Sequence, residues 1–342
     1  MVEKMSKFDS PLVSVLIPAY NHENYVQSAI KSIISQTYEN IELLVINDGS
    51  TDSTWKKICE MESECQKRFV RSIFWNQKNV GNCKTLNELL DNARGDYIYI
   101  IASDDQTLPN AIAEQVIFLE SDKTFALCVG DNEIIDDKGK ICYWDENRNI
   151  VYDKADAKFL TFASYLQFIR GFDFSSYRFG SYKELSKGNH IPNGYMIRKE
   201  SFKDFRFAEN GFLDDWQLML HISKRHKMKY LDKHLMAYRW HSSNTVKNSR
   251  KMAKMTNKTK FYERHLLKGM SLDKFSPETR RFLEKNLHAN STKRISLKLY
   301  TKAKLSFFAF VFALSQIPGI SLAFSKERKD FLLERIFLLA DW

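Results

Sequence analysis

Two adjacent acids, Asp104 and Asp105, directly follow the apolar run 97–101 and could bind a metal ion. Because two unpaired carboxylates repel each other at close range, a divalent cation is the simplest way to stabilise them. Oxygen ligands suit Mg²⁺ or Mn²⁺, and these ions complete their coordination with water and substrate phosphate. The pair therefore indicates a nucleoside diphosphate substrate, and its structural alternative is a helix N-cap ahead of Thr107 and Pro109.

Two more side chains that could bind a nucleotide follow apolar runs earlier in the chain. Asp48 comes after the run 41–46, where Gly49 permits a sharp turn, and its carboxylate could accept the N3–H of a uracil. Tyr20 comes after the run 13–17 and offers a ring that could stack on a planar base. Asp-Gly is also a common turn sequence, so Asp48 has a purely structural interpretation as well.

The three apolar runs predict buried β-strands, because they are short and rich in β-branched and aromatic residues. Apolar residues with helical spacing lie between and after them, at 25–34, 86–93, 112–119 and from Phe212 on. Strands that alternate with helices of this length are typical of an α/β protein with a parallel sheet. Because ligands bind beyond the carboxyl ends of such strands, we expect Tyr20, Asp48 and the two adjacent acids to share one edge.

The sequence lacks the motifs of several other protein classes. No G-x-G-x-x-G follows the first strand and no G-x-x-x-x-G-K-[ST] occurs, which argues against a dinucleotide dehydrogenase and a P-loop NTPase. Five cysteines without a C-x-x-C pair fit neither a disulfide framework nor a thiolate zinc site. We therefore predict a reduced, cytoplasmic protein, and residues 1–10 show neither a signal peptide nor a membrane anchor.

Positive charge is concentrated towards the C-terminus. Residues 224–304 hold 23 lysines and arginines against five acids, whereas the whole chain has a net charge of +10. The apolar stretch 305–317 follows, and as a helix it would span about 20 Å, less than a bilayer core of about 30 Å. It could anchor the protein peripherally at the inner face of the plasma membrane, or pack against the catalytic domain or a second subunit of a homo-oligomer. No recognised nucleic-acid module accompanies the charge, so no nucleic-acid partner is predicted.

Residues 157–185 hold nine aromatic side chains interleaved with glycine and serine. Such a stripe is more often core than a ligand platform, although planar sugar faces also stack on aromatic rings. Both interpretations remain open from the sequence.

The segment 13–54, VSVLIPAYNHENYVQSAIKSIISQTYENIELLVINDGSTDST, resembles the opening of glycosyltransferase family 2. These are inverting nucleotide-sugar transferases with the fold called GT-A, and the segment NVGNCKTLNELLDNARGDYIYIIASDD continues the match in order and spacing. The resemblance is close over residues 11–120. It implies a nucleotide pocket at Ala19, Tyr20 and Asp48 and a metal-binding motif at 103–105. Because the first acid of the longer D-x-D-D form is Ala102 here, the resemblance implies metal binding by Asp105, with Asp104 nearer the ribose.

The second half of the chain resembles the family more loosely. NGYMIRKESF (193–202) and FAENGFLDDWQLMLHIS resemble the acceptor-side segment, in which an acidic pair precedes a tryptophan. The resemblance makes Asp215 the catalytic base, and Asp214 has an alternative role as a helix N-cap or a partner of the helix dipole. YRWHSSNT (238–245) resembles a downstream motif whose histidine completes the metal site, which implies His241 as a second metal ligand.

The resemblance predicts an α/β protein with the GT-A fold: a catalytic domain at 1–245, with a nucleotide-binding half (11–120) and an acceptor half (121–245), then a basic and amphipathic helical region at 246–342. It implies metal-dependent transfer, with Mn²⁺ or Mg²⁺, from a UDP-sugar to a saccharide or lipid-linked saccharide acceptor of a bacterial surface glycan. Inversion in one displacement needs one base, and Asp215 would take the proton of the acceptor hydroxyl. A catalytically silent nucleotide-sugar-binding scaffold of the same fold is the alternative.

Overall fold

The computed structural model describes residues 10–209 and 212–285, and the chain divides into two compact units, 1–279 and 280–342. The first unit extends past residue 245, where the sequence predicts the end of the catalytic domain, and that boundary stays a prediction. Helix α9 (Ser249–Lys268) packs against α8 (Asp214–Ser223) within the first unit, where Lys224 Nζ lies 2.9 Å from Glu263 Oε2. Part of the basic segment thus belongs to the same unit as the predicted site.

One mixed sheet, most of it parallel, organises the described residues. Its strands follow the order β3-β2-β1-β4-β9-β6-β10-β5, and a hairpin of β7 and β8 extends from β6. Strands β1 to β4 run parallel to one another, β6 runs parallel to β10, and β9 and β5 pair antiparallel with their neighbours. The strands are β1 (Val13–Ala19), β2 (Ile41–Asp48), β3 (Arg71–Gln77), β4 (Tyr97–Ile100), β5 (Gln106–Thr107), β6 (Phe125–Ile135), β7 (Ile141–Trp144), β8 (Ile150–Val151), β9 (Met196–Arg198) and β10 (Lys227–Arg239).

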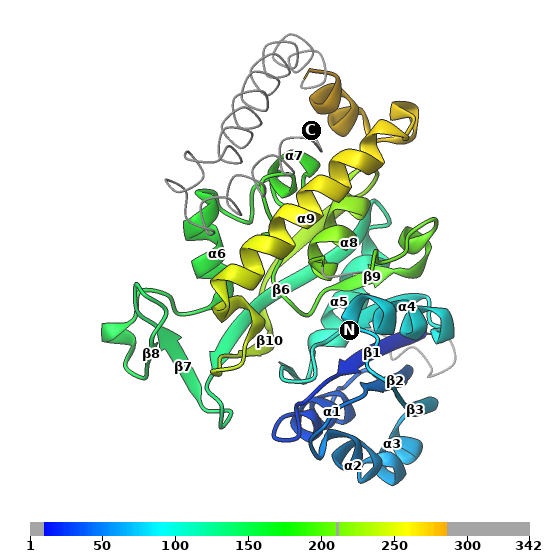
Figure 1. Ribbon diagram of the computed structural model, residues 1–342, viewed down its shortest axis with the longest axis vertical. Helices are drawn as coiled ribbons and strands as arrows, with labels where there is room; N and C mark the ends of the chain where they lie inside the picture. The colour runs from blue at the N-terminus through cyan, green and yellow to red at the C-terminus, as the bar shows by residue number, and fades with distance from the viewer. Residues whose placement is uncertain (1–9, 210–211, 286–342) are drawn as a thin grey trace, which may run out of the picture. The chain divides into compact units, whose positions relative to one another are not determined.

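Helices connect and flank these strands, and Figure 1 shows the β7–β8 hairpin projecting beyond the end of β6. The remaining helices are α1 (Val26–Ile34), α2 (Thr54–Cys59), α3 (Glu62–Arg68), α4 (Asn82–Asn92), α5 (Ala111–Ser121), α6 (Phe162–Arg170) and α7 (Tyr182–Leu185), with 3₁₀ turns at 154–156, 199–202, 245–247 and 272–274. In α1 the buried side chains Val26, Ala29, Ile30 and Ile33 recur at helical spacing, whereas all eight residues of β2 are buried. A two-faced burial of this kind is what a central parallel strand requires.

The structure confirms the predicted strands at 13–17, 41–46 and 97–101. The helix expected to open at Thr107 and Pro109 instead begins at Ala111, because Thr107 pairs with Met236 as part of β5. Asp104 and Asp105 therefore lie in a strand-to-strand connection, and the N-cap interpretation of this pair is wrong.

Within the described residues, no helix is both long and apolar enough to cross a bilayer. The apolar stretch 305–317, with its membrane and subunit interpretations, lies outside those residues. All five cysteines are free thiols, as the absence of a disulfide pattern predicted.

Candidate functional site

A cavity of about 1030 Å³ opens at the carboxyl ends of β1, β2 and β4. The residues that line it come from four separate segments that the sequence points to, and include Ala19, Tyr20, Asp48, Asp104, Asp105 and Asp215. The opposite wall comes from α6, the start of α8 and the segment that joins β10 to α9. The cavity therefore forms at the carboxyl ends of the parallel strands, the edge of the sheet at which ligand binding was expected.

The nucleotide-binding candidates occupy the ends of β1 and β2. Asp48 is buried, and its carboxylate accepts the N–H groups of Val80 and Gly81, at 2.9 and 3.0 Å, and Gln77 Nε2 at 3.1 Å. This leaves one lone pair on Oδ2 for a ligand donor. Gly49 adopts φ +68° where an added β-carbon would lie 2.4 Å from the Asn79 nitrogen, so the turn after Asp48 requires glycine. Ala19 is buried, and Tyr20 is half exposed on the cavity wall.

Three side chains form the cluster best suited to a metal ion, and Asp104 is at its centre. His241 Nε2 lies 2.9 Å from Asp104 Oδ2, His22 Nε2 lies 3.8 Å from it, and the ligand atoms of all three are within 4.8 Å of one another. A serine hydroxyl orients each imidazole through its other ring nitrogen. His22 Nδ1 lies 2.7 Å from Ser103 Oγ, and His241 Nδ1 lies 2.8 Å from Ser243 Oγ. Two nitrogens and a carboxylate oxygen facing one point fit a divalent transition-metal ion.

Asp105, the metal ligand implied by the sequence, lies outside this cluster. Its buried carboxylate accepts the Arg239 backbone N–H at 2.8 Å and Asn193 Nδ2 at 3.4 Å. Burial, and then the charge of Asp104, raise the pKa of the Asp105 carboxyl well above its ordinary value. Asp104, which the resemblance places nearer the ribose, provides the carboxylate that faces the histidines, and metal binding by Asp105 stays a prediction.

A second pair of acids begins α8. Asp215 is held by two donors, Asn189 Nδ2 at 2.7 Å from Oδ2 and the Trp216 N–H at 2.7 Å from Oδ1. Burial raises the pKa of Asp215, and these two hydrogen bonds oppose that rise. Burial and the neighbouring Asp215 charge raise the pKa of Asp214 to about 7. The N-cap residue of α8 is Leu213, so Asp214 is the first residue of the helix rather than its cap.

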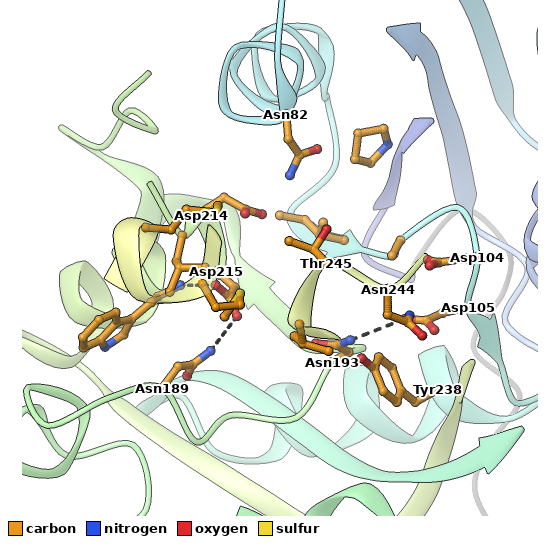
Figure 2. Close-up of a pocket in the computed structure, with 18 of the residues that line it drawn as sticks. Asn82, Asp104, Asp105, Asn189, Asn193, Asp214, Asp215, Tyr238, Asn244 and Thr245 are labelled. Carbon is orange, nitrogen blue, oxygen red and sulfur yellow. Dashed lines mark hydrogen bonds between the residues drawn. The ribbon is translucent and has the colours of Figure 1, made fainter. Parts of the chain in front are cut away.

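The two acidic pairs lie on different sides of the cavity. Figure 2 shows Asp214 and Asp215 at one side, Asp104 and Asp105 at the other, and Asn193 between them. A ligand that binds its anionic group through an ion at Asp104 would extend towards the partly buried carboxylate of Asp215. This separation suits a reaction in which a leaving group departs on one side and a proton is removed on the other.

Sequence reasoning missed His22, Asn189 and Asn193. His22 lies just beyond Tyr20 after β1, so its position relative to that strand was an available signal. Asn193 belongs to the segment 193–202, and Gly194 adopts φ +77° with no room for a β-carbon, which would lie 2.6 Å from Met236 Sδ. Nothing in the local pattern marks Asn189 as the partner of an acid 26 positions further along the chain.

A family model described as "Glycosyl transferase family 2" matches residues 14–186, about half of the chain, and the chain belongs to this family.

The chain is similar to several named glycosyltransferases over part of their length. An uncharacterised glycosyltransferase of Haemophilus influenzae is 41% identical over 128 residues, which are 37% of this chain and 39% of the relative. Glycosyltransferase GlyA of Streptococcus pneumoniae is 27% identical over 230 residues, 66% of this chain and 30% of the relative. An uncharacterised glycosyltransferase of Rickettsia felis is 38% identical over 130 residues, 38% of this chain and 21% of the relative. The chain thus covers well under half of each relative.

Two solved structures support the GT-A fold. The mannosyltransferase PcManGT of Pyrobaculum calidifontis, in complex with GDP-Man and Mn²⁺, superposes with a TM-score of 0.54 at 15% identity over 98% of this chain and 86% of that one. TarS of S. aureus, in complex with UDP-GlcNAc, superposes with a TM-score of 0.50 at 15% identity over 69% of this chain and 61% of that one.

Proposed function

We propose that this glycosyltransferase moves a sugar from a nucleotide sugar to a hydroxyl of a saccharide or lipid-linked saccharide, with inversion, in the assembly of a bacterial surface glycan. The observation that supports this most directly is the partly buried Asp215 carboxylate, which lines the same cavity as Asp104 and lies on another side of it. UDP is the proposed carrier, since Asp48 retains one acceptor position for the N3–H of a uracil.

Asp215 is the proposed base. As the acceptor oxygen bonds to the anomeric carbon and the bond to the nucleoside diphosphate breaks, Asp215 takes the hydroxyl proton. Burial makes the carboxylate more basic than an exposed aspartate, and the donors from Asn189 and Trp216 fix its two oxygens. No covalent intermediate is required, because one displacement inverts the configuration.

Asp104, His241 and His22 are the proposed ligands of the metal ion. Their two imidazole nitrogens favour Mn²⁺ over Mg²⁺, which prefers oxygen ligands. A bound ion would supply Lewis-acid stabilisation of the departing diphosphate. Mn²⁺ in the complex of PcManGT supports this choice by analogy of fold.

A hydrolysis screen tests the proposal. The full chain with Mn²⁺ is incubated with a panel of UDP- and GDP-sugars, and released nucleotide is measured with and without Asp215→Asn. We expect slow hydrolysis of at least one UDP-sugar, and a loss of about 10²- to 10⁴-fold in the Asn variant, which keeps shape but accepts no proton. Tight binding of a nucleotide sugar without any turnover would favour the silent scaffold instead. Equal rates for the variant and the parent would remove Asp215 from the mechanism.

A further inference from the structure

Arg148 forms a second polar feature of the cavity, away from both acidic pairs. It lies in the turn between β7 and β8, and its guanidinium carbon is 5.1 Å from the Tyr165 ring centroid and 5.2 Å from that of Trp240. All three residues line the cavity. The guanidinium therefore packs on the faces of aromatic rings. Its N–H groups, which have no hydrogen-bond acceptor among the described residues, can donate to a ligand in the plane of the group.

A second cation shares the same aromatic floor. Lys247 Nζ lies 4.2 Å from the Trp240 ring centroid. Among the described residues, neither Arg148 nor Lys247 has a carboxylate within ion-pair distance, in contrast to Lys187, which pairs with Glu184. Burial, and then the charge of Arg148, lower the pKa of the Lys247 ammonium. The two positive charges repel each other, and neither has a counter-ion among the described residues. An anionic ligand would therefore lower the electrostatic energy of the pair.

The backbone at Arg148 is also unusual. Its φ is +62°, in the left-handed region that residues other than glycine and asparagine rarely adopt. The Asp145 side chain stabilises the turn, because its Oδ1 accepts the N–H groups of Asn147 and Asn149 at 2.8 Å. An arginine kept in such a conformation by its surroundings suggests a function for its side chain.

We propose that Arg148 and Lys247 form a subsite for a phosphate group carried by the acceptor. This rests on the proposed function, in which the cavity holds a donor and an acceptor together. Arg148 comes from the β7–β8 turn and packs on α6, and these elements contribute none of the residues assigned to the nucleotide. A guanidinium fork matches two oxygens of a phosphate, and the adjacent ammonium adds a point charge.

Binding of inorganic phosphate to the full chain, followed by tryptophan fluorescence, tests the subsite. Arg148→Asn removes the guanidinium and retains a residue that tolerates positive φ. Lys140→Gln is the matched control, because Lys140 lies at the start of the same hairpin and stacks on Tyr152 at 4.3 Å, outside the cavity. We expect Arg148→Asn to weaken phosphate binding about tenfold or more, Lys247→Gln to weaken it less, and Lys140→Gln to leave it unchanged. Equal phosphate affinity in the parent, in Arg148→Asn and in Lys247→Gln would overturn the proposal.

Titration with UDP and Mn²⁺ distinguishes the source of the phosphate. If the acceptor carries it, Arg148→Asn should bind UDP as tightly as the parent does. A parallel loss of UDP and phosphate affinity would instead assign the guanidinium to the donor diphosphate and overturn the acceptor subsite. If phosphate binding depends on Arg148 but the parent hydrolyses no nucleotide sugar, the anion subsite stands and the proposed function fails.

Discussion

Replacing Asp214 by asparagine should stabilise the folded protein, and by more at pH 8 than at pH 5. Asp214 is a partly buried carboxyl beside a second carboxyl, Asp215, and desolvation and that neighbouring charge raise its pKa from 3.8 to about 7. Between these two values the folded state keeps a proton that the unfolded chain has released. Stability is therefore lost as pH rises through this window, and the loss is complete above pH 7.

The size of the effect follows from the two pKa values. Moving a carboxyl pKa from 3.8 to about 7 corresponds to about 4 kcal/mol of lost stability at pH 8, and to about 2 kcal/mol at pH 5. Asparagine keeps the shape and carries no charge at either pH, so it escapes this cost.

Urea unfolding at pH 5 and pH 8 measures both values directly. Asp137→Asn is the control, since it removes an exposed carboxylate and should change stability by less than about 0.5 kcal/mol at either pH. We expect Asp214→Asn to raise the free energy of unfolding by about 2 kcal/mol more at pH 8 than at pH 5. An equal change at both pH values, or destabilisation at pH 8, would refute the raised pKa of Asp214.

Two further predictions concern the base and the metal site. Asn189→Ala removes a donor that stabilises charged Asp215, so the acid limb of the kcat profile for donor hydrolysis should move up by about one pH unit. An unmoved limb would mean that Asn189 does not control the base. Asp104→Ala should weaken Mn²⁺ binding, measured by calorimetry, at least tenfold, whereas Asp105→Asn should retain it. The opposite ranking would restore Asp105 as the ligand.

The nucleotide-binding half was predictable because its signals are local. In β1 and β2 a mostly apolar run ends at a polar residue, and that transition alone places Tyr20 and Asp48 at one edge of a parallel sheet. The fold class follows from the same alternation of strands and helices. The predicted start of α5 was wrong, but it came from a local rule, because proline is favourable in the first turn of a helix. Only the pairing of Thr107 with β10 overrides that rule, and the helix begins at Ala111.

The partners of the acidic pair at 104–105 were less predictable, because these contacts join distant segments. Adjacent residues Asp104 and Asp105 have the same side chain, and the sequence offers no local reason to prefer one as a ligand. What separates them is the partner that each meets, His241 for Asp104 and the Arg239 N–H for Asp105, more than 130 positions away. Arg148 likewise gives no signal as a cavity residue until the hairpin is folded.

The partners of the acids explain why only one of them is suited to a metal ion. Asp48 and Asp105 are buried and Asp215 is partly buried, and each accepts at least one backbone N–H and one side-chain carboxamide. These amide donors occupy some of the lone pairs that a cation would need. Asp104 instead faces two imidazole nitrogens, which can release their protons and turn their lone pairs towards a shared ion. The same amide donors compensate the negative charge of these acids. The acids therefore do not need the guanidinium of Arg148 as a counter-ion, and it remains available for a ligand.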